Sequence, residues 1–594
     1  MTFTTRPEIA GTFGVVASTH WLASAAGMAV LEGGGNAFDS AVAAGFVLQV
    51  VEPHLNGPGG EVPIILHDAG TGAVEIICGQ GTAPAGATIT HYRDLGLDLV
   101  PGSGLLSAVV PGAFDAWMLL LRDHGTLRPR DVLRYAIGYA AHGYPLVSRI
   151  SATIESVEPL FQNEWPTSAA IYLPGGQVPA PGSRFRNTVL AETYERLLDE
   201  AEAKSADRED QIQSLRDGWY RGFVADAIGA FCANQELLDS SGRRHRGVLT
   251  ADDMATWQAT KEPPVTFDYH GHTFCKNGPW SQGPVFLQQL ALLAEIDLAS
   301  MDPVGPDFVH TVVEAAKLAF ADREAFYGDP DFVEVPLEIL LSADYNDRRR
   351  GLIPEEASFE LRPGSISGYG GAIDLEAATR RQTIKDAALG GGEPTMKADA
   401  AAGDTCHLDV IDRHGNMVSA TPSGGWLHAS PAIPELGFCL TSRAQMFWLE
   451  DGHPSSLAPG KRPRTTLSVN LVLRDGAPYM VFGTPGGDYQ DQWTLTFALR
   501  HLHHGMNLQE AIDAPMFQTD HMPASFWPRE ADPGSLTLEG RFSETCARAL
   551  QTRGHKVAIA EDWSLGRLSA ATSDGGLLKA AANPRMMQGY AAGR

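Results

Sequence analysis

Thr405 stands where cleavage of the backbone would turn an ordinary residue into a catalyst. It follows the stretch DAALGGGEPTMKADAAAGD and begins a run, CHLDVID, with the alternation of a β-strand. A threonine freed at its amino end carries a hydroxyl as nucleophile and an α-amine as base, and that amine titrates at about pH 7.7 to 8.0. Such a residue can attack an amide carbonyl without a Ser-His-Asp triad. The plainer alternative is a turn before a strand, so the neighbouring motifs must decide.

Three other patterns invite a chemical interpretation. Cys406 would become the N-terminal nucleophile if cleavage fell one residue later, and is otherwise a small buried strand residue. His501, His503 and His504 have a spacing that does not place all three on one helix face, so we expect no metal and no cofactor. LNGPGGEV, residues 55–62, lacks the Gly-Lys-Ser/Thr ending of a phosphate loop, and we expect a turn or a wall of the substrate site there.

The first 385 residues are predicted to be rich in helices. Residues 21–51 contain two apolar-periodic helices separated by EGGGNAFD, in which Asn36 or Asp39 can begin the second helix. Helical stripes recur in LAETYERLLDEAEA, FLQQLALLAEI and FVHTVVEAAKLAFADREAFYG. Residues 386–404 have no apolar period and are predicted to be a mobile linker.

The pattern changes at Thr405, where we predict that a sheet begins. CHLDVIDRHGNMVSAT and LSVNLVLRDGAPYMVFG carry the Arg-His-Gly-Asn and Arg-Asp-Gly turn signals of hairpins. Helices return in WTLTFALRHLHHG and LQEAIDAP, and LSAATSDGGLLKAAA is a further hairpin. Because strands and helices fall in blocks, we predict an α+β fold of stacked sheets with helices on their outer faces, not a doubly wound parallel sheet.

Composition narrows the classes of partner. The 594 residues are 44% hydrophobic and 20% charged, which is typical of a globular protein, and the formal net charge is -26. That charge argues against a nucleic acid or an anionic membrane as partner and favours a small neutral or zwitterionic substrate. No leader or long apolar stretch is evident, so we predict a cytoplasmic protein. The six cysteines lie far apart and are predicted to be buried thiols.

Six segments carry motifs that belong together. In chain order they are LEGGGNAFDSAVAAGFVLQVVEP, GVLTADDMATWQA, KLAFADREAFYGDPDF, GDTCHLDVIDRHGNMVSATPS, GKRPRTTLS and FGTPGGDYQ. In this order they resemble the gamma-glutamyltranspeptidase family of N-terminal-nucleophile hydrolases. The family has a Thr-Thr-His segment at its nucleophile, a Lys-Arg-Pro-x-Ser-Ser-Met motif and a Ser-Pro-Gly-Gly motif. Several motifs in one order are a much stronger signal than any one of them.

The resemblance implies a four-layer αββα fold made jointly by two subunits of one precursor. Self-cleavage between Asp404 and Thr405 would give a large subunit, 1–404, and a small catalytic subunit, 405–594. The two would act together as one domain on a small-molecule amide, and could assemble into a higher oligomer.

The resemblance also implies roles for individual residues. Thr405 would be the nucleophile, and Ser423 falls where the family has a threonine that hydrogen-bonds it. The N–H groups of Gly486 and Gly487 would stabilise the oxyanion. Two further hydroxyls, those of Thr465 and Thr466, replace the family's serines that hold the substrate α-carboxylate.

The clamp for a glutamyl headgroup departs from the family pattern. Ile89 stands where the family has an arginine for the α-carboxylate, Met446 where it has an acid for the α-amine, and Gly425 where it has an asparagine. A methyl-bearing side chain cannot replace a bidentate guanidinium. Arg443 is either a replacement cation or a solvated charge at the end of a strand.

Three functions remain open on the sequence. The first is an amidohydrolase or acyltransferase with altered acyl specificity, for example for a glutaryl-like group. The second is a true glutathione hydrolase or gamma-glutamyltransferase with a rebuilt clamp. The third is an unprocessed, non-catalytic scaffold, which the retained Thr405, Ser423 and Pro-Gly-Gly set disfavours.

Overall fold

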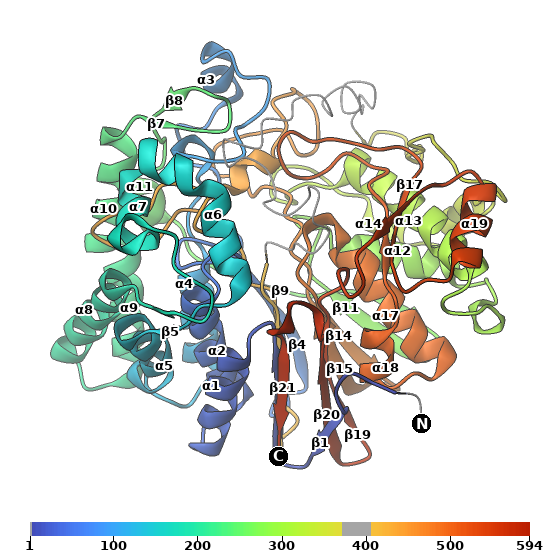
Figure 1. Ribbon diagram of the computed structural model, residues 1–594, viewed down its shortest axis with the longest axis horizontal. Helices are drawn as coiled ribbons and strands as arrows, with labels where there is room; N and C mark the ends of the chain where they lie inside the picture. Colours follow the sequence, from blue (N-terminus) through green and yellow to red (C-terminus); the bar gives the residue numbers. More distant parts are fainter. Residues whose placement is uncertain (1–2, 371–404) are drawn as a thin grey trace.

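Two seven-stranded sheets pack face to face between two layers of helices in the computed structural model, which describes residues 3–370 and 405–594 (Figure 1). The predicted four-layer αββα arrangement is confirmed. The predicted linker, 386–404, lies outside the described residues.

One sheet contains the strand that follows Thr405. Its order is β21-β2-β12-β13-β3-β4-β9, and all neighbouring strands are antiparallel. The bounds are β2 Gly14–Ser18, β3 Val62–Asp68, β4 Ala73–Gly79, β9 Thr260–Glu262, β12 Leu408–Asp412, β13 Met417–Ala420 and β21 Tyr590–Gly593.

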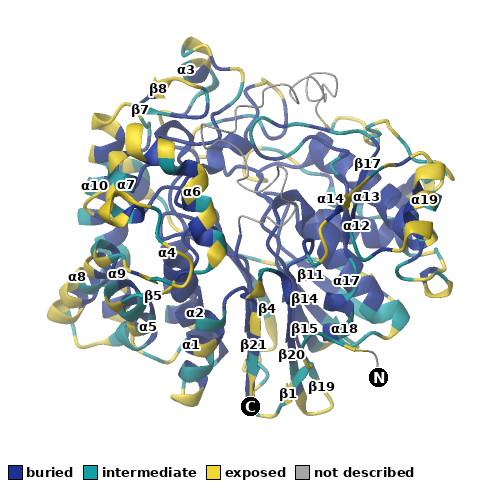
Figure 2. Ribbon diagram, in the orientation of Figure 1, coloured by how far each residue is buried: buried dark blue, intermediate teal, exposed yellow. Residues whose placement is uncertain are grey.

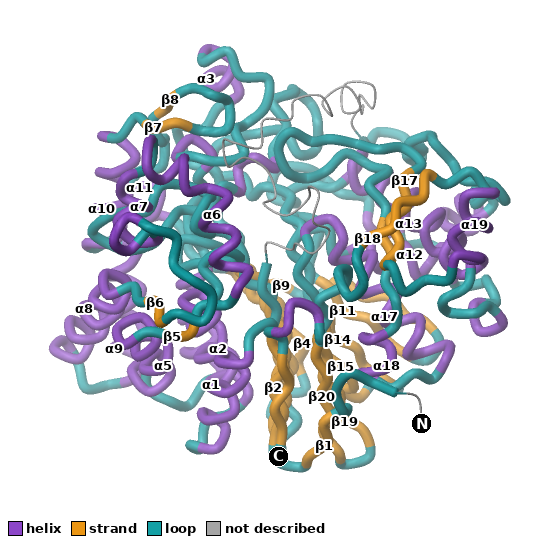
Figure 3. The backbone as a smooth tube through the Cα atoms, in the orientation of Figure 1, coloured by secondary structure: helices purple, strands orange, loops and turns teal. Residues whose placement is uncertain are grey.

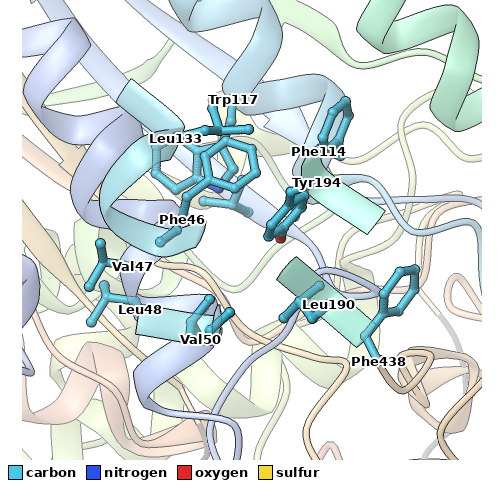
Figure 4. Packing of buried hydrophobic residues seen from close by; sticks show 14 of the residues in the cluster. Phe46, Val47, Leu48, Val50, Phe114, Trp117, Leu133, Leu190, Tyr194 and Phe438 are labelled. Carbon is cyan, nitrogen blue, oxygen red and sulfur yellow. The ribbon is translucent and has the colours of Figure 1, made fainter. Parts of the chain in front are cut away.

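A helical layer covers the outer face of this sheet. Asn36 and Asp39 form a capping box that begins the central helix, as their types predicted. Figure 4 shows Phe46, Trp117 and Tyr194, from three helices of this layer, packed against one another. The bounds in this part of the chain are α1 Trp21–Glu32, α2 Ala37–Val51, α3 Ile89–Asp94, α4 Ala113–His124, α5 Pro129–His142, α6 Ser148–Asn163, α7 Pro166–Tyr172, α8 Thr188–Lys204, α9 Arg208–Tyr220, α10 Phe223–Asn234 and α11 Ala251–Thr256, with the short strands β5 Tyr144–Pro145, β6 Arg184–Phe185, β7 Leu237–Leu238 and β8 Arg244–His245.

The second sheet has the order β1-β20-β19-β15-β14-β11-β10. Its strands are β1 Ile9–Gly11, β10 Val265–Tyr269, β11 His272–Lys276, β14 Asn470–Arg474, β15 Ala477–Gly483, β19 Ser569–Asp574 and β20 Leu577–Ala582. The other elements on this side are α12 Pro284–Leu293, α13 Pro306–Phe326, α14 Leu337–Leu340, α15 Ala343–Arg350, α17 Gln490–His504, α18 Leu508–Asp513 and α19 Glu544–Thr552, with a small sheet of β16 Phe517–Gln518, β17 Ser535–Glu539 and β18 Lys556–Ala560.

An apolar cluster joins the inner faces of the two sheets. It includes Val15 and Ile65 from the first sheet and Val481 and Ala571 from the second, all fully buried. Figure 2 shows the buried sheets in the middle and the exposed residues mostly on the outer helices and loops. Each sheet takes strands from both sides of position 405, so the two parts of the chain share one core.

The prediction that a sheet begins at Thr405 was too narrow. β2 and β3, which flank the β12–β13 hairpin, come from the part of the chain predicted to be helix-rich. Figure 3 shows β2 as one of the strands in the middle of the molecule. All five residues of β2 and the first six of β3 are buried. A strand buried on both faces has no polar-apolar alternation, and for that reason its sequence does not identify it.

All six cysteines are free and buried, as predicted. Within residues 3–370 and 405–594, no helix has both the length and the apolar character needed to cross a membrane.

Candidate active site

Thr405 lies directly before β12 and is held beside Ser423. The two residues form an antiparallel bridge, and the N–H of Cys406 donates to the carbonyl of Pro422 at 2.9 Å. Thr405 Oγ1 lies 3.2 Å from Ser423 Oγ, and both residues are only 1% exposed. The hydroxyl pair expected from the sequence is therefore within hydrogen-bonding distance.

A buried ion pair supports this hydroxyl pair from the other side. Arg443 Nη2 donates to Ser423 Oγ at 2.8 Å, and Arg443 Nε donates to Glu61 Oε1 at 2.5 Å. Glu61 in turn exchanges two backbone hydrogen bonds with Ser423, at 2.9 and 3.0 Å. Arg443 is 1% exposed, so its interpretation as a solvated strand-end charge is wrong.

The ion pair determines the direction of one hydrogen bond at Ser423. A guanidinium has only donors, so Ser423 Oγ accepts from Arg443 and has its own proton left to donate. Thr405 Oγ1, 3.2 Å away, can accept that proton. The positive charge of Arg443 is already matched by Glu61, which leaves little net charge for a substrate carboxylate.

Aromatic and thioether groups enclose the guanidinium. The rings of Trp426 and Phe526 lie 5.5 and 5.6 Å from the central carbon of Arg443. Met446 Sδ lies 3.8 Å from Arg443 Nη1, and Met446 packs with both aromatic rings in one small buried cluster. Met446 therefore belongs to the wall around Arg443, and no carboxylate replaces the missing acid at that position.

Gly486 and Gly487 form the turn that leads into α17. Their φ angles are +124° and +51°, in the region that favours glycine. A Cβ on Gly486 would lie 2.3 Å from Trp493 Cζ3, so no larger residue fits. Asp488 anchors the turn because it accepts 2.7 Å hydrogen bonds from both the N–H and the hydroxyl of Ser525.

The two threonines proposed for carboxylate binding differ in their environments. Thr465 Oγ1 accepts from the N–H of Leu467 at 3.3 Å, and its backbone bridges to Ser281. Thr466 is 1% exposed, and its hydroxyl has no hydrogen-bond partner among the residues that the structure describes. Thr466 is thus the better placed of the two to donate to a ligand.

Gly425 and Ile89 do not present side chains to this site. Gly425 has a φ of +65°, and a Cβ there would lie 2.9 Å from the backbone nitrogen of Gly60. The asparagine of the family pattern could not be accommodated by this backbone. Ile89, the first residue of α3, packs against an apolar cluster that includes Ala444 and Phe447.

Cys406 faces away from Thr405, because successive side chains of an extended segment point to opposite faces. Its thiol donates to Glu52 Oε2 at 2.9 Å and accepts from Asn56 Nδ2 at 3.0 Å. Burial raises the pKa of the Cys406 thiol well above its usual value. A thiol that resists ionisation is a poor nucleophile, which argues against the Cys406 alternative.

The three histidines near the end of α17 have separate environments. His501 Nε2 lies 2.7 Å from the hydroxyl of Tyr479, and His503 Nε2 lies 2.8 Å from that of Tyr269. His504 packs edge-on against Phe308. These contacts account for the histidines as structural residues.

In the described part of the chain, His310, Glu314 and His555 have the spacing of metal ligands. Glu314 Oε1 accepts from Lys317 Nζ at 2.6 Å, so the carboxylate is already neutralised. His310 Nδ1 and His555 Nε2 lie 2.9 Å apart, as in a direct hydrogen bond. An ion pair and a histidine pair explain this cluster without a metal.

The sequence and fold of the chain match those of one known protein family. Residues 23–593 match the family model described as Gamma-glutamyltranspeptidase. The chain belongs to the gamma-glutamyltranspeptidase family. A solved structure named LmbA2991HD is 55% identical, with full coverage of both chains and a TM-score of 0.93.

Two more distant relatives carry functional names. The Glutathione hydrolase-like YwrD proenzyme of Bacillus subtilis (strain 168) is 30% identical over 97% of this chain and 98% of its own length. The solved cephalosporin acylase of Bacillus halodurans is 27% identical, with a TM-score of 0.82 and coverage of 100% of this chain and 98% of the acylase. As a member of the gamma-glutamyltranspeptidase family, the chain is an N-terminal-nucleophile hydrolase of the amide-hydrolysing or acyl-transferring type.

Glu61 is the residue of this site that sequence reasoning missed. It lies in LNGPGGEV, which was interpreted only as a turn or a substrate wall. The available signal was an acid directly before the apolar run VPIIL, because a carboxylate at the start of a buried strand needs a cationic partner. Arg443 was the candidate cation, but nothing local in the sequence joins the two.

Proposed function

We propose that this chain is an autoprocessing amidohydrolase or acyltransferase with Thr405 as its N-terminal nucleophile. The observation that carries the proposal is the 3.2 Å contact between Thr405 Oγ1 and Ser423 Oγ at the start of a buried strand. Cleavage of the Asp404–Thr405 bond then gives a large subunit, 1–404, and a small subunit, 405–594. The relative YwrD is named a proenzyme, which supports processing.

The mechanism follows from the groups around Thr405. The freed α-amine takes the proton of Thr405 Oγ1 as the hydroxyl attacks the amide carbonyl, and Ser423 orients that hydroxyl. The N–H groups of Gly486 and Gly487 stabilise the oxyanion. The amine half then leaves with a proton, and water or a second amine attacks the ester to release the acyl group.

The acyl group is proposed to differ from γ-glutamyl. Met446 supplies no acid for an α-amine, and Glu61 already neutralises Arg443, so the charged glutamyl headgroup lacks both of its expected partners. We therefore assign Arg443 to the positioning of Ser423 instead of the substrate-clamp role expected from the sequence. One solved relative is named a cephalosporin acylase, which supports an acyl group other than γ-glutamyl.

The alternatives are distinguished by this site. A true gamma-glutamyltransferase would need a new partner for the α-amine, although YwrD is named glutathione hydrolase-like. A scaffold would have no use for the pairing of Thr405 with Ser423. The cytoplasmic location and any higher oligomer stay predictions.

Purified protein and a panel of γ-glutamyl, glutaryl and plain acyl p-nitroanilides test the proposal. We expect two fragments, the smaller beginning with Thr405, and weak turnover of the γ-glutamyl compound relative to another acyl anilide. Strong saturable turnover of the γ-glutamyl compound would favour the rebuilt clamp. A single uncut chain without amidase activity would favour the scaffold.

A further inference from the structure

Four charged side chains form one buried cluster beside the turn Gly486–Gly487, which we call the oxyanion turn. They are Arg323 and Glu324 of α13, Arg464 and Asp488. Arg323 donates to both carboxylates, through Nη1 to Asp488 Oδ1 and through Nη2 to Glu324 Oε1. Arg464 Nη1 also donates to Glu324 Oε1. Each of the four residues is at most 4% exposed, so these contacts are shielded from solvent.

The charges in this cluster stabilise one another. Burial disfavours the ionised form of Glu324, but the guanidiniums of Arg464 and Arg323 outweigh this effect and hold the pKa of Glu324 at about 2. Burial likewise disfavours the charged form of Arg323, but Asp488 and Glu324 outweigh it and raise the pKa of Arg323. Arg323 and Glu324 are therefore both ionised at neutral pH.

Two contacts lead from Arg323 to the oxyanion turn. The first is the ion pair with Asp488, which directly follows Gly487. The second passes through Gln282, because Arg323 Nη1 donates to Gln282 Oε1 at 2.8 Å and Gln282 Nε2 donates to the carbonyl of Gly487 at 3.3 Å. Glycine has more backbone freedom than any other residue, so a turn of two glycines depends on such contacts to keep one conformation.

The same cluster contacts the other segments that are proposed to bind substrate. Arg464 comes directly before Thr465 and Thr466, and its Nη2 donates to Ser525 Oγ at 2.9 Å. The N–H of Gln282 donates to the carbonyl of Thr465 at 2.9 Å. The oxyanion turn, the two threonines and Ser525 therefore share one set of charged partners.

We propose that Arg323, with Glu324 and Gln282, is a positioning residue that holds the oxyanion turn in its active conformation. The inference rests on the proposed function and adds to it the groups on which oxyanion stabilisation depends. These three residues lie in 1–404, whereas the oxyanion turn lies in 405–594. Figure 1 shows α13 on the same side of the molecule as α17, which follows the turn. The large piece thus contributes to catalysis without touching the substrate.

Arg323→Met tests this role, with Arg323→Lys as the conservative variant and Arg349→Met as the control. Arg349 forms a buried salt bridge with Asp322, the neighbour of Arg323 in α13, and its Nη2 donates to the carbonyls of Leu318 and Arg362. The control therefore removes a similar buried cation on the same helix, away from the oxyanion turn.

The kinetic constants on the best acyl anilide, per chain cut at Thr405, give the first readout. The oxyanion forms only along the reaction, so Arg323→Met should lower kcat at least about tenfold and leave KM within about threefold. Arg323→Lys should retain more of kcat, because it keeps the charge. Arg349→Met should lose stability in urea and keep both constants. Gln282→Met leaves no unpaired charge and should lower kcat in the same direction as Arg323→Met.

Hydrogen–deuterium exchange gives a second readout that does not depend on activity. The peptide that spans residues 483–490 should exchange faster in Arg323→Met than in the unmodified protein and in Arg349→Met. The peptide that spans 408–412, in β12, should exchange alike in all three proteins.

The inference and the proposed function can fail separately. The inference is overturned if kcat is unchanged in whichever of Arg323→Met and Gln282→Met folds, or if Arg323→Met and Arg349→Met lose kcat equally. A higher KM with unchanged kcat would also overturn it. None of these results affects a fragment that begins with Thr405 or turnover by the unmodified protein. An uncut, inactive unmodified chain would instead refute the proposed function, and faster exchange at 483–490 in Arg323→Met would still support the positioning of the turn.

Discussion

Arg443→Met tests two effects of the Arg443–Glu61 pair, one on the stability of the fold and one on the position of Ser423. The substitution removes the guanidinium and leaves Glu61 as a buried carboxylate without its ion-pair partner. It also removes the 2.8 Å hydrogen bond to Ser423. The first loss should lower stability, and the second should lower activity.

The magnitudes follow from burial. Both side chains are at most 1% exposed, and removing one partner of a buried ion pair costs about 3 to 5 kcal/mol of unfolding free energy. Glu61→Gln together with Arg443→Met removes both charges and should recover at least about 2 kcal/mol of this loss. A hydrogen bond from a charged donor is worth about 1.5 to 3 kcal/mol, so kcat/KM should fall about 10- to 150-fold in both variants.

Urea denaturation, the rate of precursor cleavage on gels and kcat/KM on the best acyl anilide measure these effects. Arg216→Met is the control, because Arg216 forms a salt bridge with buried Asp115, on elements that carry no site residue. It should lose stability and keep kcat/KM. The reasoning is refuted if the double variant is no more stable than Arg443→Met, or if it processes and turns over like the unmodified protein.

Four further predictions follow from the site. Thr405→Ala should remain a single inactive chain of 63.6 kDa on gels, whereas Cys406→Ala should still yield a fragment whose Edman sequence begins with Thr405. Gly486→Ala should lower kcat by about 100-fold or more, since a Cβ there would lie 2.3 Å from Trp493 and would displace an oxyanion donor; near-normal kcat would exclude that role. kcat/KM should rise with pH through about 7.7 to 8.0, because the α-amine must be neutral to act as base; a flat profile would contradict this. Burial lowers the pKa of His428 to about 3 in the folded protein, against about 6.5 in the unfolded chain, so the unfolded state binds more protons as the pH falls below 6.5. The free energy of unfolding from urea denaturation should therefore fall by about 2 kcal/mol between pH 7 and pH 5 because of His428, and His428→Leu should lack this part of the loss.

Local signals in the sequence predicted local structure well. Asn36 and Asp39 cap α2, and the hairpin signal of LSVNLVLRDGAPYMVFG produces β14 and β15, because a cap or a two-residue turn depends on neighbouring residues. β3 was missed because a strand buried on both faces is only a short apolar run.

The site was predictable only in part, because some of its contacts join residues that are far apart in the sequence. Thr405 and Ser423 were expected to pair from family motifs, and they lie within hydrogen-bonding distance. Glu61 and Arg443 are 382 positions apart, so only the folded chain reveals that each neutralises the other. Ile89 was assigned to the clamp from alignment of a motif, but its side chain packs in a separate apolar cluster.

Both sheets combine strands from before and strands from after position 405, so segments that are far apart in the sequence lie side by side. β21 pairs with β2, and the carbonyl of Arg594 accepts from the N–H of Phe13, so the early and late segments of the chain are neighbours. Thr405 lies at the other end of the same sheet, since Leu408 is opposite Ser18 and Asp412 is opposite Gly14. A cut before Thr405 therefore falls at the opposite end of the sheet from the Phe13–Arg594 contact and interrupts none of the strand pairings described above. Each of the two pieces would lack strands that complete both sheets, so neither can bury its sheet faces without the other.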